Sequence, residues 1–224
     1  ARAVRTALTA EMWESINAAW LELRRIEDAR DHSIPMPREE IDAFLDFVKM
    51  ISREFDGAAY RTMLRDEAYW FSRIGLYIER ADNTARILDV KYHVLLPDTE
   101  RVGGTLDYFQ WTAILRSVSA LTAYHWVYHE SIKPWLIMDL LVTRREMPRS
   151  LVSCYENVER YLDLIGQSHG QQGPAQRLAR STYTHLLNSR REEIFQRGVH
   201  EFVDEFVANN NRLGRLIAEQ YLLS

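Results

Sequence analysis

Helical periodicity, with every proline falling between periodic segments, is the feature that most constrains the fold of this chain. Proline lacks a backbone donor and clashes with the preceding turn, so it marks helix ends. None of the six prolines falls inside a segment with regular hydrophobic spacing: Pro35, Pro37, Pro97, Pro134, Pro148 and Pro174. Residues 3–27 show the i, i+3, i+4 apolar spacing of a helix, and no segment shows strand-like alternation. We therefore expect an all-α fold, a helical bundle of about seven or eight helices.

The same spacing and punctuation predict where the helices begin and end. A proline followed by two glutamates, at residues 37–40, is a typical helix start. The segment GQSHGQQGP at 166–174 is typical of a linker. The expected helices cover 3–27, a stretch from 37, a stretch from after Gly57 to about 96, 107–130, a short stretch after 134, a stretch ending before 166, and an interrupted stretch from about 174 to 222.

Composition favours one globular domain covering residues 1–224. Hydrophobic residues make up 46% of the 224 positions, which is enough for a substantial core. The net charge of -4 argues against nucleic acid as a partner, since phosphate binding needs a basic excess. The single Cys154 excludes an internal disulfide and suits a reducing compartment. The sequence has no apolar run long enough for a membrane span and no signal-peptide pattern. We expect a cytoplasmic protein with no membrane partner.

Residues 69–90, YWFSRIGLYIERADNTARILDV, place arginines where a helix should be apolar. At about 100° per residue, five polar residues share an arc of roughly 60°. This polar stripe consists of Asp66, Arg73, Tyr77, Arg80 and Thr84. Apolar residues border it on both sides, and the solvent face is marked elsewhere by Glu79, Asp82, Arg86 and Asp89. Buried guanidinium groups are costly unless carboxylates or a ligand complete their hydrogen bonds. The stripe therefore predicts either an internal network that fixes helix register or a cleft for an anion.

The angular positions of these residues on the helix predict specific contacts. Arg73 and Arg80 lie about 10 Å apart along the axis, which suits two acceptors or one extended acceptor. We expect both to be less exposed than Arg86, and each to bond a carboxylate or a ligand. Glu79 points about 100° away from Arg80, so the two should not pair with each other. We expect Glu79 to bond another helix or Arg86.

A second polar row lies near the C-terminus. Glu193, Arg197, His200 and Asp204 follow i, i+4, i+7, i+11 spacing. Surface ion pairs explain most such rows. The row also fits a position in the same cleft as the polar stripe, and we count its first three residues as candidate binding residues.

Other reactive residues are assigned to structure. His125 and His129 could reach one metal, but they lack a third ligand at a recognisable zinc spacing, so we assign no metal. Cys154 occupies a helical position beside apolar residues, which favours a core cysteine over a nucleophile. No Gly-rich phosphate loop, HExxH, GxSxG or CxxC motif occurs, so we assign no catalytic residue and no cofactor.

Several segments carry a resemblance to a known family. They are Glu79–Arg80 within YIERADNTARILD, MLRDEAYWF before it, KYHVLL after it, Glu11, Trp13 and Asn17 near the start, MPRS at 147–150, and RREEIFQRGVHEF at 190–202. With them the chain resembles the bacterial alpha-E proteins, named for predicted helices and a Glu-Arg motif. Members of that family usually carry a further N-terminal stretch with an earlier motif copy. The resemblance therefore implies that this chain is the C-terminal part of a longer protein.

The resemblance also implies a role. Alpha-E proteins are encoded beside, or fused to, circularly permuted ATP-grasp proteins and transglutaminase-like proteins. ATP-grasp enzymes activate a carboxylate as an acyl phosphate, which an amine attacks to form an amide. An accessory component of such a peptide-synthesis or peptide-modification system is implied, with Arg73 and Arg80 holding a peptide carboxylate or the domain docking the ligase. Two alternatives stay open: an enzyme using Glu193 and His200 as an acid–base pair, and a structural domain in which Glu79–Arg80 fixes helices.

Overall fold

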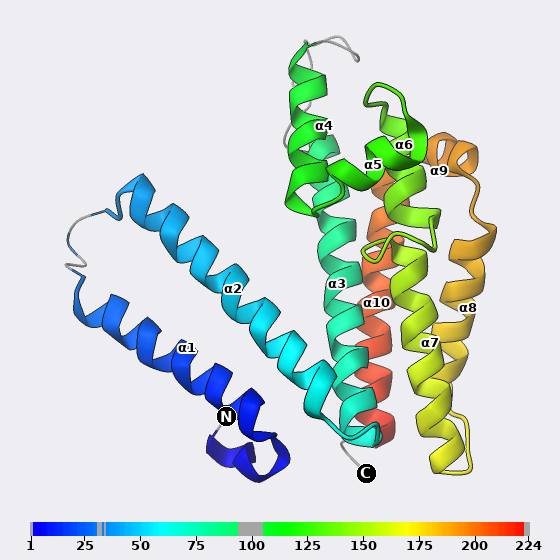
Figure 1. Cartoon of the computed structure of the whole chain (residues 1–224). Helices are drawn as coiled ribbons and strands as arrows, with labels where there is room; N and C mark the ends of the chain where they lie inside the picture. The colour runs from blue at the N-terminus through cyan, green and yellow to red at the C-terminus, as the bar shows by residue number, and fades with distance from the viewer. Residues whose placement is uncertain (1, 31–32, 34, 94–104, 222–224) are drawn as a thin grey trace. The chain divides into compact units, whose positions relative to one another are not determined.

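The computed structural model describes residues 2–30, 33, 35–93 and 105–221. In these residues it contains ten α-helices, one 3-10 helix, one π-helical segment and no strand (Figure 1). The all-α prediction is therefore confirmed. The elements are η1 (Arg2–Ala7), α1 (Ala10–Asp28), α2 (Arg38–Thr62), α3 (Glu67–His93), α4 (Thr105–Ser117), α5 (Leu121–Tyr128), α6 (Pro134–Met138), η2 (Asp139–Thr143), α7 (Leu151–Ser168), α8 (Pro174–Asn188), α9 (Arg191–Arg197) and α10 (Val199–Tyr221).

The helices are more numerous than expected because two long stretches are divided. The stretch 107–130 breaks between α4 and α5, where Ser119 adopts a left-handed backbone with φ 56°. The stretch after Pro174 divides into α8, α9 and α10, and Gly198 separates the last two with φ 102°. Glycine adopts such an angle without a steric penalty. The boundary expected at Gly57 is wrong, since α2 continues through it. The end expected near residue 96 lies outside the described residues.

The chain forms two compact units, residues 1–69 and 70–224. In the first, α1 and α2 form an αα-hairpin. Thr9 caps α1 by accepting a hydrogen bond from the Met12 backbone N–H, and its Oγ1 lies 2.6 Å from Oγ1 of Thr62 at the end of α2. The start of α1 therefore lies beside the end of α2, and the two helices run antiparallel. The single domain over 1–224 stays a prediction.

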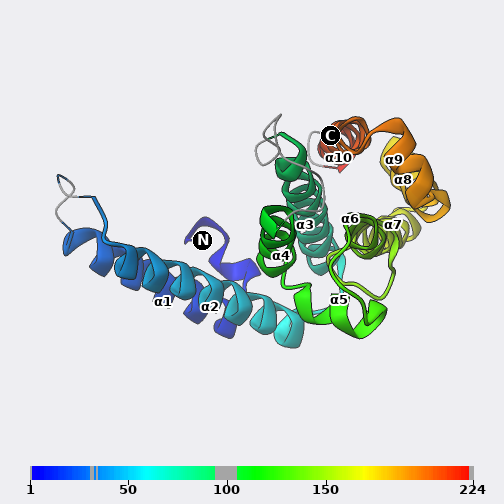
Figure 2. The same ribbon diagram turned by 90° about the horizontal axis from the view of Figure 1, so that it is seen from above.

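The second unit contains four long helices, α3, α7, α8 and α10, which lie side by side (Figures 1 and 2). Their apolar faces form its core, and the fully buried residues there include Ala81, Leu88, Leu151, Tyr155, Leu162, Ala179 and Leu213. Prolines at the first helical positions of α6 and α8 start these helices as expected. No described helix is both long enough and apolar enough to cross a membrane.

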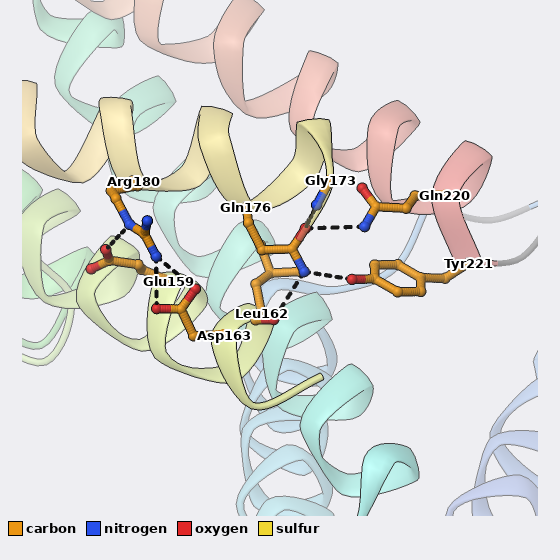
Figure 3. Close-up of polar contacts among 8 residues, drawn as sticks. All are labelled: Glu159, Leu162, Asp163, Gly173, Gln176, Arg180, Gln220 and Tyr221. Atoms are coloured by element: carbon orange, nitrogen blue, oxygen red, sulfur yellow. Dashed lines mark hydrogen bonds and ion pairs between the residues drawn. The ribbon is translucent and has the colours of Figure 1, made fainter. Parts of the chain in front are cut away.

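Two buried amides hold these helices in register. Figure 3 shows Gln176 on α8, whose Nε2 donates to the Leu162 carbonyl of α7 at 3.1 Å and to the Tyr221 hydroxyl of α10. Its Oε1 accepts from Gly173 N and from Gln220 Nε2. On the exposed side of α7 and α8, Arg180 pairs with Glu159 and Asp163 (Figure 3).

The second amide lies next to the Glu-Arg turn of α3. Asn210 on α10 donates from Nδ2 to the Ile78 carbonyl at 3.1 Å, and its Oδ1 accepts from the Tyr155 hydroxyl at 2.9 Å. Asn210 is buried, so losing either partner would leave a polar atom unsatisfied. One side chain therefore joins α3, α7 and α10 immediately before Glu79 and Arg80.

Candidate functional site

The polar stripe of α3 is largely withdrawn from solvent, as expected. Arg73 is 8% exposed and Thr84 is fully buried, and Tyr77 and Arg80 are half-buried. The Arg86 side chain is 57% exposed, so the predicted order of exposure is confirmed. The flank of α3 beside the stripe is buried in the core, at Ile74, Ala81, Ala85 and Leu88. Two arginines of one helix therefore lie against the bundle rather than on its wet face.

Tyr77 lies between these two arginines. The guanidinium carbons of Arg73 and Arg80 each lie 5.4 Å from the centroid of the Tyr77 ring. The Tyr77 ring stacks on Tyr161 of α7, with centroids 6.3 Å apart and planes 21° apart. Arg160 covers the Tyr161 ring at 4.7 Å. Aromatic faces attract cations, so this stack stabilises several positive charges between α3 and α7.

A third arginine comes from the turn before α7. Arg149 precedes Ser150, the residue that caps α7 with its side chain. It is half-buried, and that burial, followed by the positive charge of Arg80, lowers its pKa. The charges of Arg80 and Arg149 also both act on the Cys154 thiol of α7, which places the two arginines in the same region of the bundle. We call Arg73, Arg80 and Arg149 the arginine cluster.

Cys154 lies close to the arginine cluster but is not a nucleophile. Its thiol is fully buried, and burial raises its pKa to about 12. The charges of Arg80 and Arg149 act in the opposite direction without reversing the shift. A thiol protonated at neutral pH is inert. The prediction of a core cysteine is confirmed.

Arg80 and Arg149 differ from the other half-buried charges of the bundle in their partners. Within the described part of the chain, no hydrogen bond or ion pair reaches either guanidinium group. The carboxylate partner expected for Arg80 is therefore not found among these residues. One turn further along α3, the buried Thr84 Oγ1 also has no hydrogen-bond partner among the described residues. Arg80 and Arg149 thus combine unused N–H donors, positive charge and restricted solvent access.

Glu79 faces away from this cluster. Its side chain is exposed and makes no ion pair with any described residue. Arg86, one of its expected partners, instead bonds Asp82 at 2.6 Å. Among the described residues, Glu79 and Arg80 do not form a bridge. The prediction that Glu79 bonds another helix or Arg86 is wrong. A solvated glutamate remains accessible to another protein.

Asp66 has a local structural task. The helical pattern of the sequence predicts that Asp66 lies within the motif helix, but α3 begins at Glu67. Asp66 is exposed, and its Oδ1 accepts from the Tyr69 backbone N–H at 3.2 Å, the contact of a helix cap. It therefore satisfies one of the free N–H groups at the start of α3.

The second polar row is divided between two helices by Gly198. Glu193 is exposed on α9, and Arg197 pairs with Glu205. His200 lies on α10, where its Nδ1 is 2.8 Å from Asp89 Oδ1 and its Nε2 is 3.3 Å from Asp204 Oδ2. Asp89 follows Arg80 on α3 by about 14 Å along the axis. His200 therefore lies at a level of α3 well beyond Arg80.

Arg149 and Tyr161 are residues of this site that the sequence does not predict. Arg149 belongs to the MPRS segment that carried the resemblance. It lies in the turn before α7, and helical periodicity gives no position for a residue outside a helix, so the sequence could not place it beside Arg80. Tyr161 lies on α7, and only the packing of α7 on α3 brings it to Tyr77. His125 and His129 are exposed at the end of α5, as expected.

Fold and site together define an all-α bundle whose motif helix presents Arg80, a half-buried arginine without a carboxylate partner among the described residues. The description of one family matches residues 1–222: Alpha-E, a predicted alpha-helical domain with a conserved ER motif. The chain belongs to the Alpha-E family. Glu79–Arg80 on α3 is the ER dipeptide that carried the resemblance in the sequence. No curated protein and no solved structure matches the chain significantly.

Proposed function

We propose that this domain is the binding component of an amide-ligase system for peptide synthesis or modification, in which a circularly permuted ATP-grasp protein performs the ATP-dependent step. The arginine cluster receives a carboxylate, either from a peptide substrate or from an acidic segment of the ligase. A transglutaminase-like protein is a second candidate partner. We assign the system to the cytoplasm, where the single cysteine stays reduced.

The observation that carries this proposal is the pair Arg80 and Arg149. Two half-buried guanidinium groups close enough to repel each other are unfavourable unless an anion lies between or beside them. Among the described residues neither group has such a partner. A carboxylate would accept charge-assisted hydrogen bonds from both and remove their repulsion.

The first test measures peptide binding to the full chain. An N-acetylated trialanine peptide with a free C-terminal carboxylate is titrated against the same peptide ending in an amide. We expect the carboxylate form to bind and the amide form to lose at least about tenfold in affinity, the loss of one charge-assisted hydrogen bond. Arg149→Ala should abolish this preference, whereas Arg86→Ala, at an exposed arginine on α3, should leave it unchanged. Equal binding of both peptides, or a preference that survives Arg149→Ala, contradicts a carboxylate site.

A second test addresses the ligase partner. The full chain is co-purified with the proposed partner, a circularly permuted ATP-grasp protein, and Glu79→Gln and Arg80→Ala are compared with Arg86→Ala. We expect co-purification with the native chain and with Arg86→Ala. If the ATP-grasp protein no longer co-purifies with Arg80→Ala, the arginine cluster is the docking site. If it no longer co-purifies with Glu79→Gln, the exposed face of α3 that carries Glu79 is the docking site. No recovery of the native complex contradicts a stable partnership.

The structural alternative has an observation in its favour, because Arg73 and Arg80 already contact Tyr77. If these contacts only fix helix register, Arg80→Ala should destabilise the bundle. If Arg80 is kept for a ligand, the substitution should leave stability unchanged or raise it by relieving Arg149. The acid–base alternative is less well supported, because His200 contacts Asp89 and Asp204 whereas Glu193 is exposed on another helix.

A further inference from the structure

The imidazole of His200 lies between two carboxylates from different helices. Nδ1 is 2.8 Å from Asp89 Oδ1 on α3, and Nε2 is 3.3 Å from Asp204 Oδ2 on α10. His200 and Asp204 are four residues apart and so project from one face of α10. Asp89 approaches from the facing helix. The three side chains therefore converge from two helices of the bundle.

Their spacing suits metal coordination. One ligand atom can be chosen from each residue so that all three lie within 4.8 Å of one another. An ion bound at about 2.0–2.2 Å from each ligand atom holds those atoms about 3–4 Å apart. Because Asp89 and Asp204 face different nitrogens of one ring, the imidazole or one carboxylate must rotate for all three residues to share one ion. Facing helices of bundles can build metal sites from carboxylates and a histidine. Here the ligands lie at the edge of the bundle, since the Asp204 side chain is 68% exposed.

We propose that Asp89, His200 and Asp204 form a binding site for one divalent first-row transition ion, such as Zn²⁺ or Mn²⁺. One ring nitrogen and one oxygen from each carboxylate are the protein ligands, and water takes the open positions. The imidazole nitrogen favours these ions over Mg²⁺ and Ca²⁺, which prefer oxygen ligands alone. Two carboxylates balance the charge of the ion.

Access and location agree with this assignment. Asp89 and His200 are half-buried and Asp204 is exposed, so an ion can enter from solvent and keep water ligands. The site joins the last turns of α3 to the first turns of α10. These turns of α10 directly follow Gly198, which separates α9 from α10. A bound ion would therefore fix the motif helix against α10 at a point about 14 Å beyond Arg80. This inference does not depend on the arginine cluster binding an anion.

Without a metal, the same geometry is a histidine bridging two carboxylates, so the experiment must separate the two. The full chain, stripped with a chelator and dialysed, is titrated with ZnCl2, MnCl2 and MgCl2 by calorimetry, and its melting temperature is measured with each ion. We expect one Zn²⁺ or Mn²⁺ per chain with a raised melting temperature, and at least tenfold weaker binding of Mg²⁺.

Variants locate the ion. Asp204→Asn keeps the Asp89–His200 hydrogen bond, and so preserves the contact between α3 and α10, but should weaken Zn²⁺ binding at least tenfold. His200→Gln should remove binding, and His125→Gln, at an exposed histidine of α5, should bind as the native chain does. Should Asp204→Asn fail to fold, which circular dichroism would show, Asp89→Asn replaces it with the same expectation. Absence of binding by the native chain, or stoichiometric binding unchanged in Asp204→Asn and His200→Gln, overturns the proposal.

Discussion

At the scale of single residues, Arg80 and Arg149 show a mismatch: each carries a positive charge in a half-buried position without a carboxylate partner among the described residues. Elsewhere in the bundle, some exposed arginines have carboxylate partners, as Arg180 has Glu159 and Asp163. Arg80 and Arg149 are more buried, yet no described carboxylate bonds them. Stability alone would favour the reverse distribution, because burying an unpaired charge is costly. The carboxylate binding proposed above would remove this cost.

This mismatch gives a prediction about stability. Arg149→Met keeps an unbranched aliphatic stem and removes the charge, so it relieves both the burial cost and the repulsion from Arg80. We expect the midpoint of urea unfolding to stay the same or rise, by up to about 1–2 kcal/mol in unfolding free energy. Arg180→Met, which removes an exposed paired arginine, should change it by no more than about 1 kcal/mol. A clear loss of stability in Arg149→Met would show that Arg149 is a structural residue.

Cys154 allows a second test at this scale. Its thiol is fully buried and its pKa is raised to about 12, so at pH 7–8 it is protonated and shielded. We expect iodoacetamide to label the native chain far more slowly than the urea-unfolded chain, as mass spectrometry can follow. Complete labelling of the folded chain within minutes would contradict both the burial and the raised pKa.

At the scale of elements, α3 is held by contacts that position its Glu-Arg turn. The buried Asn210 on α10 donates a hydrogen bond to the Ile78 carbonyl of α3 and accepts one from the Tyr155 hydroxyl of α7. Replacing it with alanine leaves both groups without this partner. We expect Asn210→Ala to lower the unfolding free energy by about 1–3 kcal/mol, measured by urea denaturation. The neighbouring Asn211 is exposed, and Asn211→Ala should cost no more than about 0.5 kcal/mol. Equal effects of the two substitutions would contradict the role given to Asn210.

Elements that depend on local chemistry were predictable from the sequence. Pro134 and Pro174 begin helices as expected, because their fixed φ suits the first helical position whatever the surroundings. The break at Ser119 carried no such signal, since serine has no preference for the left-handed backbone that it adopts there. Gly198 did carry one, but a glycine within a periodic segment is compatible with a continuous helix.

The site was predictable only along one helix. The wheel placed Arg73, Tyr77 and Arg80 together because helical geometry fixes their relative phase. The neighbours from other elements depend on packing: Arg149 from a turn, Tyr161 from α7, and the approach of Asp89 to His200. Periodicity within a helix gives no information about which face of another helix meets it.

At the scale of the whole molecule, the chain lacks the sequence features that hold a nucleotide. Phosphate binding usually needs a glycine-rich backbone cradle with a positioned lysine and a metal-binding carboxylate. The only adjacent glycines, Gly103 and Gly104, are not followed by Lys-Ser or Lys-Thr, and the chain has three lysines in all. The bundle also joins helices through side-chain amides such as Gln176, in a framework suited to presenting a fixed surface. The proposed function assigns the ATP-dependent step to a partner, which does not require such features in this chain.

We therefore expect no ATP hydrolysis and no amide-bond formation by the purified chain alone. Phosphate release should be seen when the ATP-grasp protein is added together with a carboxylate-bearing peptide, because that enzyme makes the acyl phosphate. Arg80→Ala should lower the rate of the combined system by about tenfold or more, the loss expected for one charge-assisted contact, without changing the helical circular dichroism of the chain. Arg86→Ala is the matched control and should leave the rate unchanged. Nucleotide hydrolysis by the isolated chain, abolished by a single substitution within it, would instead make this domain an enzyme.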